Sequence, residues 1–289
     1  MRLPDFLIIG AQKCGTSWLH RMLRSHRRVY LPEDKDDEFF SCLPHKPLVD
    51  YARRFTAAPA EVLIGDACAS YFWTGAEDPA PVGFNPEIPR TVQQSLGGRI
   101  KLIVLVKDPV ERAVSAYLHH VTHRSLDCNI SITEAPDRLG LIAMSRYGRH
   151  LENWLHYYSA DRFLVLPAVG SATAREVIDT VCAFLGIEPL LDSSGVEQYV
   201  FPGLRRLSLD DGIWVEVGQS GIESVDMVRR PVPTMVRDGK TYIRLVAADE
   251  LGLVKKRLEA DTAHFAELVR RYFWDHRAFH AWRTWPATG

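Results

Sequence analysis

The stretch FLIIGAQKCGTSWLHRML, residues 6–23, joins an apolar run, two glycines and an amphipathic segment. The run that ends at Gly10 has the length and composition of a buried parallel strand, and the apolar residues of the last segment fall on one helical face. We therefore predict a strand over residues 5–10, a loop, and a helix over residues 16–26. Backbone N–H groups in such a loop, with the positive end of the helix, form a cradle for a phosphate-type anion; a plain tight turn is the alternative.

The position of the lysine separates this loop from that of nucleoside triphosphatases. Gly10 and Gly15 have the spacing of the motif G-x-x-x-x-G-K-S/T, but Thr16 stands where the lysine belongs. The lysine of this loop is Lys13, between the two glycines. The segment LIVLVKDP, residues 102–109, has the pattern of a Mg²⁺-binding strand of such enzymes. Without the lysine the pair of motifs is incomplete, which disfavours Mg²⁺-dependent phosphate chemistry.

The rest of the chain alternates between strand and helix patterns. Further strands are predicted over residues 29–32, 62–67, 99–109 and 162–167, and further helices over residues 110–124, 147–158, 172–186 and 248–273. Residues 76–90, which contain four prolines, are interpreted as a loop, and residues 187–245 as a loop-rich region. Strands alternating with helices long enough for crossovers predict an α/β fold with a P-loop-like parallel sheet flanked by helices on both faces. We expect a single domain over residues 1–289.

Composition and charge exclude several classes of protein. The chain has 289 residues, of which 46% are hydrophobic, and a net charge of −1, which argues against partners such as nucleic acids or long polyanions. Its five cysteines include no C-x-x-C pair, so we expect neither a zinc site nor a disulfide framework. The sequence shows no signal peptide and no apolar stretch of transmembrane length. We therefore expect a cytoplasmic protein that binds no membrane.

Two segments, FLIIGAQKCGTSWL (6–19) and KLIVLVKDPVERAVSAYLHH (101–120), are similar to motifs of the sulfotransferases that use 3′-phosphoadenylyl sulfate (PAPS). The first resembles the loop that binds the 5′-phosphosulfate, in the form found in the heparan-sulfate branch. The second resembles the strand and helix that bind the 3′-phosphate, with Lys107 and Ser115 in the binding positions. Because both motifs occur in the family's order, the chain is identified as a member of this family, of a soluble bacterial type.

Four further segments extend the resemblance over most of the chain. KDDEFF (35–40) is similar to the family's K-E-x-x-F-F, and YGRHLENWL (147–155) to its Y-x-x-x-L-x-x-W-L helix. DGIWVE (211–216) resembles a segment whose aromatic residue lies against the adenosine in the family. DGKTY (238–242) resembles the loop that closes over the donor. The chain departs from the family at three positions: Lys107 replaces an arginine, Asp36 a glutamate and Ala67 a lysine. The cysteines that bracket the late loop in Golgi enzymes are also absent, since Val215 stands at the first.

The resemblance implies a set of site residues. Those expected to bind the donor and its product, adenosine 3′,5′-bisphosphate, are Gln12, Lys13, Cys14, Gly15, Thr16, Ser17, Lys107, Ser115, Trp214, Gly239, Lys240, Thr241 and Tyr242. Lys13 is expected to stabilise the leaving oxygen, and Asp36 to accept the acceptor's proton. Other candidates for the base are Glu38, His20, His119, His120 and His123. A solvated charged turn around Asp36, a core tryptophan at 214 and an ordinary hairpin turn at 238–239 remain alternatives.

The expected function is sulfuryl transfer from PAPS to a hydroxyl or amine of a small-molecule acceptor, of which a natural product is one candidate. No metal is expected, because a lysine supplies the positive charge that the leaving group needs. Residues 41–61, 76–95 and 187–235 leave room for an acceptor pocket, and the sequence does not decide the oligomeric state. The alternatives are a P-loop small-molecule kinase and a catalytically impaired nucleotide-binding protein, which the changes at Asp36 and Ala67 keep open.

Overall fold

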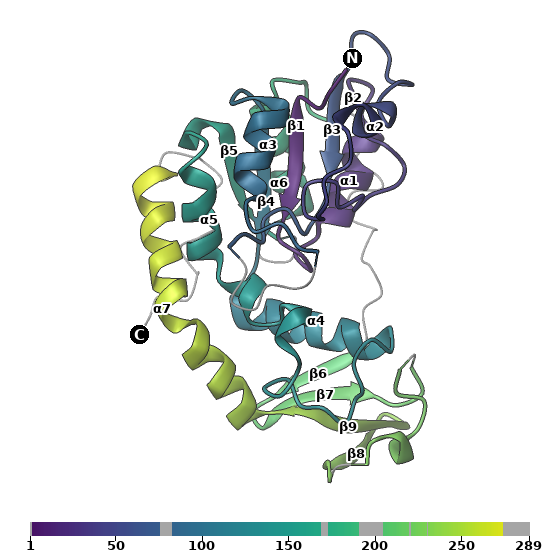
Figure 1. Ribbon diagram of the computed structural model, residues 1–289. Coiled ribbons are helices and arrows are strands. Elements are labelled where there is room, and N and C mark those ends of the chain that lie inside the picture. The colour runs from purple at the N-terminus through teal and green to yellow at the C-terminus, as the bar shows by residue number, and fades with distance from the viewer. Residues whose placement is uncertain are drawn as a thin grey trace. The chain divides into compact units, whose positions relative to one another are not determined.

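The computed structural model describes residues 2–75, 83–168, 173–190, 205–219, 221–229 and 231–273 (Figure 1). The chain divides into two compact units. The first unit comprises Met1–Asp108, Arg146–Val200 and Asp261–Gly289, and the second comprises Pro109–Ser145 and Phe201–Ala260. The chain therefore passes between the units several times, and the single-domain organisation stays a prediction.

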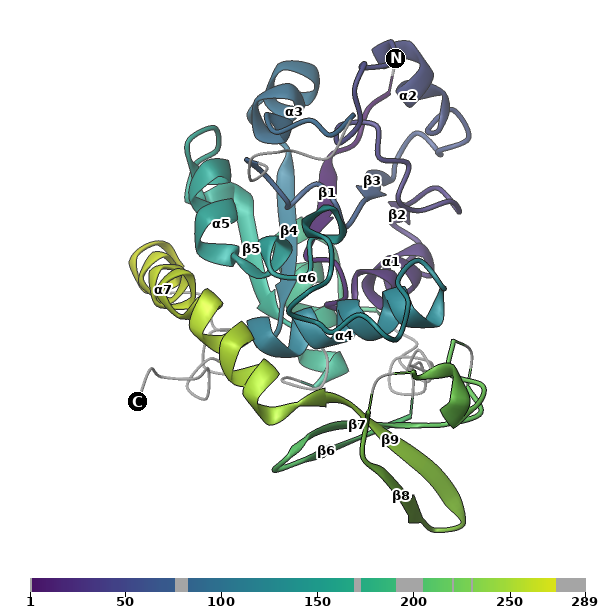
Figure 2. The ribbon, with the colours of Figure 1, turned by 60° about the horizontal axis from the view of Figure 1, so that its bottom comes forward.

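The sheet of the first unit is parallel, as predicted. In the described residues it has five strands in the order β2-β3-β1-β4-β5. Their bounds are β1 Phe6–Gly10, β2 Val29–Tyr30, β3 Leu63–Ala67, β4 Lys101–Val106 and β5 Phe163–Pro167. Helices lie on both faces of this sheet (Figure 1, Figure 2). They are α1 Thr16–Arg24, α2 Leu48–Arg53, α3 Ile88–Leu96, α5 Tyr147–Leu155, α6 Ala174–Leu185 and the C-terminal part of α7 Ala248–Tyr272. The predicted α/β fold is confirmed.

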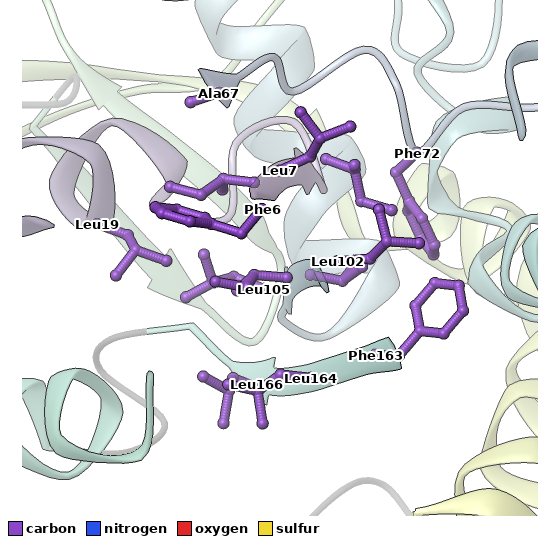
Figure 3. Packing of buried hydrophobic residues seen from close by; sticks show 14 of the residues in the cluster. Phe6, Leu7, Leu19, Ala67, Phe72, Leu102, Leu105, Phe163, Leu164 and Leu166 are labelled. Carbon is purple, nitrogen blue, oxygen red and sulfur yellow. The ribbon is translucent and has the colours of Figure 1, made fainter. Parts of the chain in front are cut away.

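The hydrophobic core of the first unit is built on the neighbouring strands β1, β4 and β5, of which β5 is the last in the strand order (Figure 3). Their apolar runs are nearly continuous because helices cover both faces of the sheet, so that neither face can be polar. Phe6 of β1 pairs in register with Gly65 of β3. A Cβ atom at position 65 would lie 2.2 Å from the Phe6 ring, so the glycine at this position provides the space for that ring.

The second unit contains α4 Pro109–Thr122 and an antiparallel sheet. As far as this unit is described, the sheet has the order β6-β7-β9-β8, with β6 Arg206–Leu209, β7 Gly212–Glu216, β8 Thr234–Arg237 and β9 Lys240–Ala247. Figure 2 shows β8 and β9 joined as a hairpin. The interpretation of residues 187–245 as a loop-rich region therefore missed these strands. Strands β6 and β8 have four residues each and are partly exposed, and polar residues interrupt the eight-residue strand β9. They therefore lack the long apolar runs that marked β1 and β4.

Smaller differences from the predicted elements concern short segments. Helices α2 and α3 were missed, and α3 begins inside the expected loop over residues 76–90, of which residues 76–82 lie outside the described ranges. Single 3₁₀ turns occur at Asp137–Leu139, Ala143–Ser145, Ala160–Arg162 and Val225–Met227. Within the described ranges, none of the helices combines the length and apolar character needed to span a membrane.

Candidate functional site

The loop between β1 and α1 has the backbone conformation that its glycines allow. Gly15 precedes α1 with a φ of 93°, and Lys13 has a φ of 67°, both in the left-handed region. A Cβ atom at Gly10 would lie 2.6 Å from the Cβ atom of Phe72 and 3.2 Å from the carbonyl oxygen of Ala69. Gly10 is therefore required because a side chain there would collide with Phe72. Gly15 is required for its φ angle, which residues with a side chain rarely adopt. Crowding is not the reason at Gly15, because a Cβ atom built there has no described atom within 4 Å.

The start of α1 is suited to an anion. No side chain caps this helix terminus, and its first turn contains no acidic residue. The first N–H groups of a helix have no partner within the helix, and they carry the positive end of its dipole. The loop is fastened to α5, because the Cys14 thiol lies 3.5 Å from the Tyr147 hydroxyl and both residues are buried. The Gln12 amide oxygen is buried, and no hydrogen-bond partner for it lies among the described residues.

Lys107 lies at the same edge of the sheet as this loop. It follows the last residue of β4, and the carbonyl of Leu105 in β4 accepts a hydrogen bond of 2.7 Å from the N–H of Ala11. In a parallel sheet this carboxyl edge is where ligands bind. The fold therefore brings Lys107 and the loop between β1 and α1 to one edge, and their roles in donor binding stay predictions.

Asp36 is fixed at this edge by three hydrogen bonds. Its N–H donates to the Ala67 carbonyl at 2.9 Å, and its Oδ1 accepts from the Ala69 N–H at 2.8 Å. Its Oδ2 accepts from Lys35 Nζ at 2.5 Å. The segment that holds Asp36 is in turn bonded to β1, because the Cys68 N–H donates to the Ile8 carbonyl at 3.0 Å. Asp36 is thus connected, through residues 67–69, to the strand that precedes the loop between β1 and α1.

The other candidate bases are held differently. Glu38 is exposed, and its Oε2 accepts a weak hydrogen bond from the Cys42 thiol at 3.6 Å. Burial and the nearby Glu38 carboxylate raise the pKa of Cys42. His20 is buried and its Nε2–H donates to the Pro32 carbonyl at 2.9 Å, while burial lowers the pKa of its imidazole. The His20 ring therefore has a structural contact of its own.

The remaining predicted residues belong to the second unit. Ser115 is half-buried on α4. Near the end of this helix the His119 ring lies 5.7 Å from that of His120, and 4.0 Å from that of His123, which follows the helix. Trp214 on β7 is 6% exposed, and its indole N–H donates to Asp211 at 2.8 Å. Buried hydrophobic residues of α4, β7 and β9 form a second core cluster, which contains Ile213 and Val215 but not Trp214 between them.

The segment predicted to close over the donor is a regular hairpin. Asp238 and Gly239, with φ values of 51° and 71°, form the two-residue turn between β8 and β9. Lys240 and Thr241 begin β9, and Lys240 Nζ lies 3.2 Å from Glu216 Oε2. Tyr242 pairs with Glu216 across the sheet. The hairpin alternative describes the local structure, and a role in donor binding stays a prediction.

The second unit also contains a cavity of about 560 Å³. It is lined by the C-terminal end of α4, the residues that follow it, and the segment over residues 221–229. Arg124 and Arg229 contribute positive charge to its lining, and Asp127 and Asp226 negative charge. Residues 221–229 belong to the range 187–235 that was expected to leave room for an acceptor pocket, and acceptor binding at this cavity stays a prediction.

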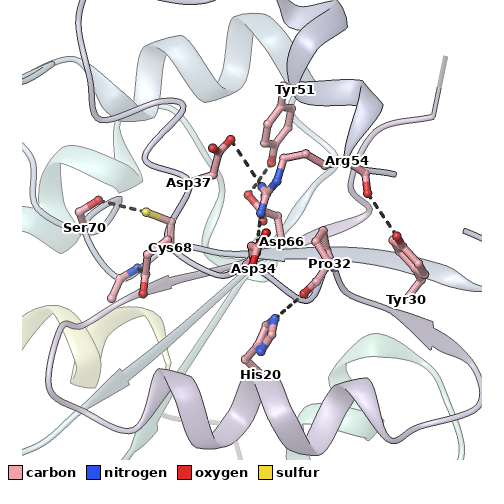
Figure 4. A network of polar contacts seen from close by, with 12 residues as sticks. His20, Tyr30, Pro32, Asp34, Asp37, Tyr51, Arg54, Asp66, Cys68 and Ser70 are labelled. Carbon is pink, nitrogen blue, oxygen red and sulfur yellow. Dashed lines mark hydrogen bonds and ion pairs between the residues drawn. The ribbon is translucent and has the colours of Figure 1, made fainter. Parts of the chain in front are cut away.

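Sequence reasoning missed a buried polar network next to Asp36 (Figure 4). Asp66 of β3 is 1% exposed and accepts hydrogen bonds from Tyr51 and Arg54. An acidic residue inside the apolar run VLIGDA was the available signal, because a buried carboxylate needs partners elsewhere in the chain.

Comparisons with known proteins add to this geometry. The sulfotransferase domain family matches residues 3–200. The bifunctional heparan sulfate N-deacetylase/N-sulfotransferase 4 of Mus musculus is 29% identical over 265 residues, which cover 83% of this chain and 28% of that protein. Carbohydrate sulfotransferase 15 of Mus musculus is 27% identical over 252 residues, covering 65% of this chain and 44% of that protein. The chain spans about a quarter of the length of the heparan sulfate relatives.

A solved structure has the same fold. The crystal structure of a sulfotransferase from Alicyclobacillus acidocaldarius superposes with a TM-score of 0.61 at 20% sequence identity. The superposition covers 98% of this chain and 100% of that chain.

Proposed function

Because this chain belongs to the sulfotransferase domain family, we propose that it transfers a sulfuryl group from PAPS to a hydroxyl or amine of a small-molecule acceptor. One observation carries the proposal. The Asp36 carboxylate, which is suited to accept a proton, is hydrogen-bonded to Ala69, and the Ala69 carbonyl lies against Gly10 at the start of the phosphate loop. A proton acceptor and an anion cradle thus lie on adjacent segments of one unit.

The residues of the loop fit the 5′ end of such a donor. The left-handed conformation at Lys13 and Gly15, the uncapped start of α1 and the lack of acidic residues in its first turn all favour an anionic group. Thr16 and Ser17 supply hydroxyl donors. In the proposed assignment the loop residues hold the 5′-phosphosulfate, and Lys107 and Ser115 hold the 3′-phosphate. Trp214 and residues 239–242 are proposed to bind the adenosine and to close over the donor.

The chain's own residues have separate tasks in the transfer. When bound, the donor supplies a sulfate–phosphate anhydride whose bridging oxygen gains negative charge as the bond to sulfur breaks. Lys13 neutralises that charge, which is the electrostatic part of catalysis. Asp36 accepts the proton of the acceptor's O–H or N–H. The backbone bonds of Asp36 to Ala67 and Ala69 hold its carboxylate in one orientation, which reduces the entropy lost on reaching the reactive geometry.

A small acceptor agrees with the charge of the chain. The relatives named above include enzymes named for heparan sulfate, a polyanionic polysaccharide. A net charge of −1 gives this chain no overall attraction for such a polymer. We propose a small hydroxylated or aminated molecule instead, with a natural product as one candidate.

The test is an assay of purified protein with PAPS in the presence of a chelator. A set of phenols, alcohols and amines is supplied, and the formation of adenosine 3′,5′-bisphosphate is measured. Turnover with any member supports the proposal. Failure to consume PAPS combined with failure to bind adenosine 3′,5′-bisphosphate would overturn it.

Two alternatives give different results in the same experiment. ATP turnover that requires Mg²⁺ would favour a small-molecule kinase, although Lys13 is placed differently from the lysine of such enzymes. Binding of adenosine 3′,5′-bisphosphate without turnover on any acceptor would favour a nucleotide-binding protein with impaired catalysis. Replacement of the family's glutamate by Asp36 and of its lysine by Ala67 is the reason to include this alternative.

A further inference from the structure

Asp66 at the end of β3 carries a buried carboxylate with two strong partners. Its Oδ1 accepts from Arg54 Nη1 at 2.8 Å, and its Oδ2 accepts from the Tyr51 hydroxyl at 2.8 Å (Figure 4). Tyr51 is 1% exposed, and burial, together with Asp66, raises the pKa of its hydroxyl well above the ordinary value. Tyr51 therefore remains a neutral donor, and the charge of Asp66 is balanced by Arg54.

Arg54 extends from this buried pair to the acidic segment, which comprises residues 34–38. Its Nη2 donates to the Asp34 carbonyl at 2.7 Å, and its Nη1 lies 3.8 Å from Asp37 Oδ2. One guanidinium thus contacts residues on both sides of Asp36 while it is held by Asp66. Burial alone would lower the pKa of Arg54, but the carboxylates of Asp66 and Asp37 raise it, so the group stays charged.

The acidic segment needs such support. Asp36 and Glu38 have φ values of 63° and 55°, in the left-handed region that residues with a side chain adopt less readily than glycine. Strained conformations of this kind persist where the surroundings determine them. The following Phe39 stacks on Tyr51, with ring centroids 4.6 Å apart, so the chain segment that carries Arg54 contacts the acidic segment at both of its ends.

We propose that Arg54 is a positioning residue for the sulfuryl transfer proposed above, on which this inference rests. Anchored by Asp66, its guanidinium fixes the backbone over residues 34–37, and thereby keeps the Asp36 carboxylate bonded to Ala69. Arg54 contacts neither donor nor acceptor in this proposal. Its effect on the reaction passes through Asp36.

The variants separate positioning from folding. Arg54→Met removes the guanidinium but leaves Asp66 buried and unpaired, which destabilises proteins strongly. The double variant Arg54→Met with Asp66→Asn removes that stranded charge and keeps an acceptor for Tyr51. Arg54→Lys keeps the charge without the two-pronged geometry. The matched control is Arg53→Met, because the Arg53 side chain is 74% exposed and pairs with Asp50 on the surface of α2.

The first readout is hydrogen exchange over residues 34–38 in the donor-free protein, which needs no catalysis. We expect exchange in the double variant to be at least roughly 10-fold faster than in the wild type, and unchanged in Arg53→Met. The second readout is steady-state kinetics. We expect kcat to fall about 100-fold with KM for PAPS within about twofold, and Arg54→Lys to recover part of kcat.

The outcomes distinguish this inference from the proposed function. A wild-type protein without PAPS turnover would overturn the proposed function, and the exchange experiment alone would then decide whether Arg54 orders the acidic segment. An active wild type with unchanged exchange, or with unchanged kcat in the double variant, would overturn the role of Arg54. Faster exchange together with the selective loss of kcat supports it.

Discussion

The Asp36 carboxylate accepts a hydrogen bond of 2.8 Å from the backbone N–H of Ala69. Ala69 also contacts the phosphate loop, since its carbonyl oxygen lies 3.2 Å from the position of a Cβ atom built on Gly10. A single residue therefore separates the proposed base from the proposed anion cradle. Asp36 is connected to the loop through Ala69, because Ala69 follows β3 in the chain and β3 pairs with β1 in the sheet.

Asp36 and Glu38 are distinguished by neutral replacements of the same shape. We expect Asp36→Asn to lower kcat about 10²- to 10⁴-fold, the usual contribution of a general base. The asparagine oxygen can still accept from Ala69, so the fold should be unaffected. Glu38→Gln should stay close to the wild type, because the Glu38 carboxylate contacts Cys42, whereas that of Asp36 contacts Ala69 beside Gly10. Steady-state kinetics with PAPS check this, and the reverse pattern would assign the base to Glu38.

Lys13 allows stability and activity to be separated. Its left-handed φ of 67° suits glycine better than a residue with a side chain. We expect Lys13→Gly to leave the free energy of unfolding unchanged or raise it by up to about 1 kcal/mol, yet to abolish turnover. Lys13→Ala should also abolish turnover, and Lys255→Ala on the exposed surface of α7 serves as a control. Urea unfolding and a PAPS assay measure both quantities. Near-normal turnover without the lysine contradicts its proposed role.

Lys107 is expected to distinguish ligands by their 3′-phosphate. Lys107→Ala should weaken the binding of adenosine 3′,5′-bisphosphate roughly 10- to 100-fold, the value of one charged hydrogen bond. The binding of adenosine 5′-monophosphate should not change, because it has no 3′-phosphate. Lys107→Arg should retain the preference, since the charge is kept. Isothermal titration calorimetry checks this, and an equal loss for both nucleotides would rule out a specific 3′-phosphate contact.

Gly65 tests the packing of the first unit. A Cβ atom at this position would lie 2.2 to 2.7 Å from three carbons of the Phe6 ring. We expect Gly65→Ala to lower the free energy of unfolding by about 3 kcal/mol because the core must shift. Gly98→Ala is the control, since no atom lies within 4 Å of a Cβ built there. Urea unfolding of both variants decides the comparison, and equal stability would show that the ring moves without cost.

Buried thiols predict a loss of stability at high pH. Burial raises the pKa of the Cys68 thiol from 9.0 to about 12, and burial raises the pKa of the Cys182 thiol from 9.0 to about 11. Above pH 9 the unfolded chain loses these protons while the folded chain keeps them. The free energy of unfolding should therefore fall as pH rises from 9 to 11, by up to about 1.4 kcal/mol per pH unit and thiol. Urea unfolding in reducing buffer measures the slope, and Cys68→Ala should make it shallower.

The sequence by itself determined the strand, loop and helix at the N-terminus and the parallel sheet of the first unit. These follow from local signals: long apolar runs, a glycine at position 15 that permits a left-handed backbone, and amphipathic periodicity. The positions of Lys13 and Lys107 at the ends of β1 and β4 follow from the same signals, since the carboxyl ends of parallel strands share one edge. Family motifs supplied Asp36 as a candidate, which periodicity alone did not distinguish from a charged turn.

Only the tertiary structure decided what surrounds Asp36. Its bond to Ala69, and the chain of contacts from Asp66 through Arg54 to the acidic segment, join residues that no local pattern relates. The antiparallel sheet of the second unit was likewise missed, because its strands depend on pairing with neighbours rather than on apolar runs of their own. Local propensity specifies elements, whereas burial of polar groups requires partners that only the folded chain brings within hydrogen-bonding distance.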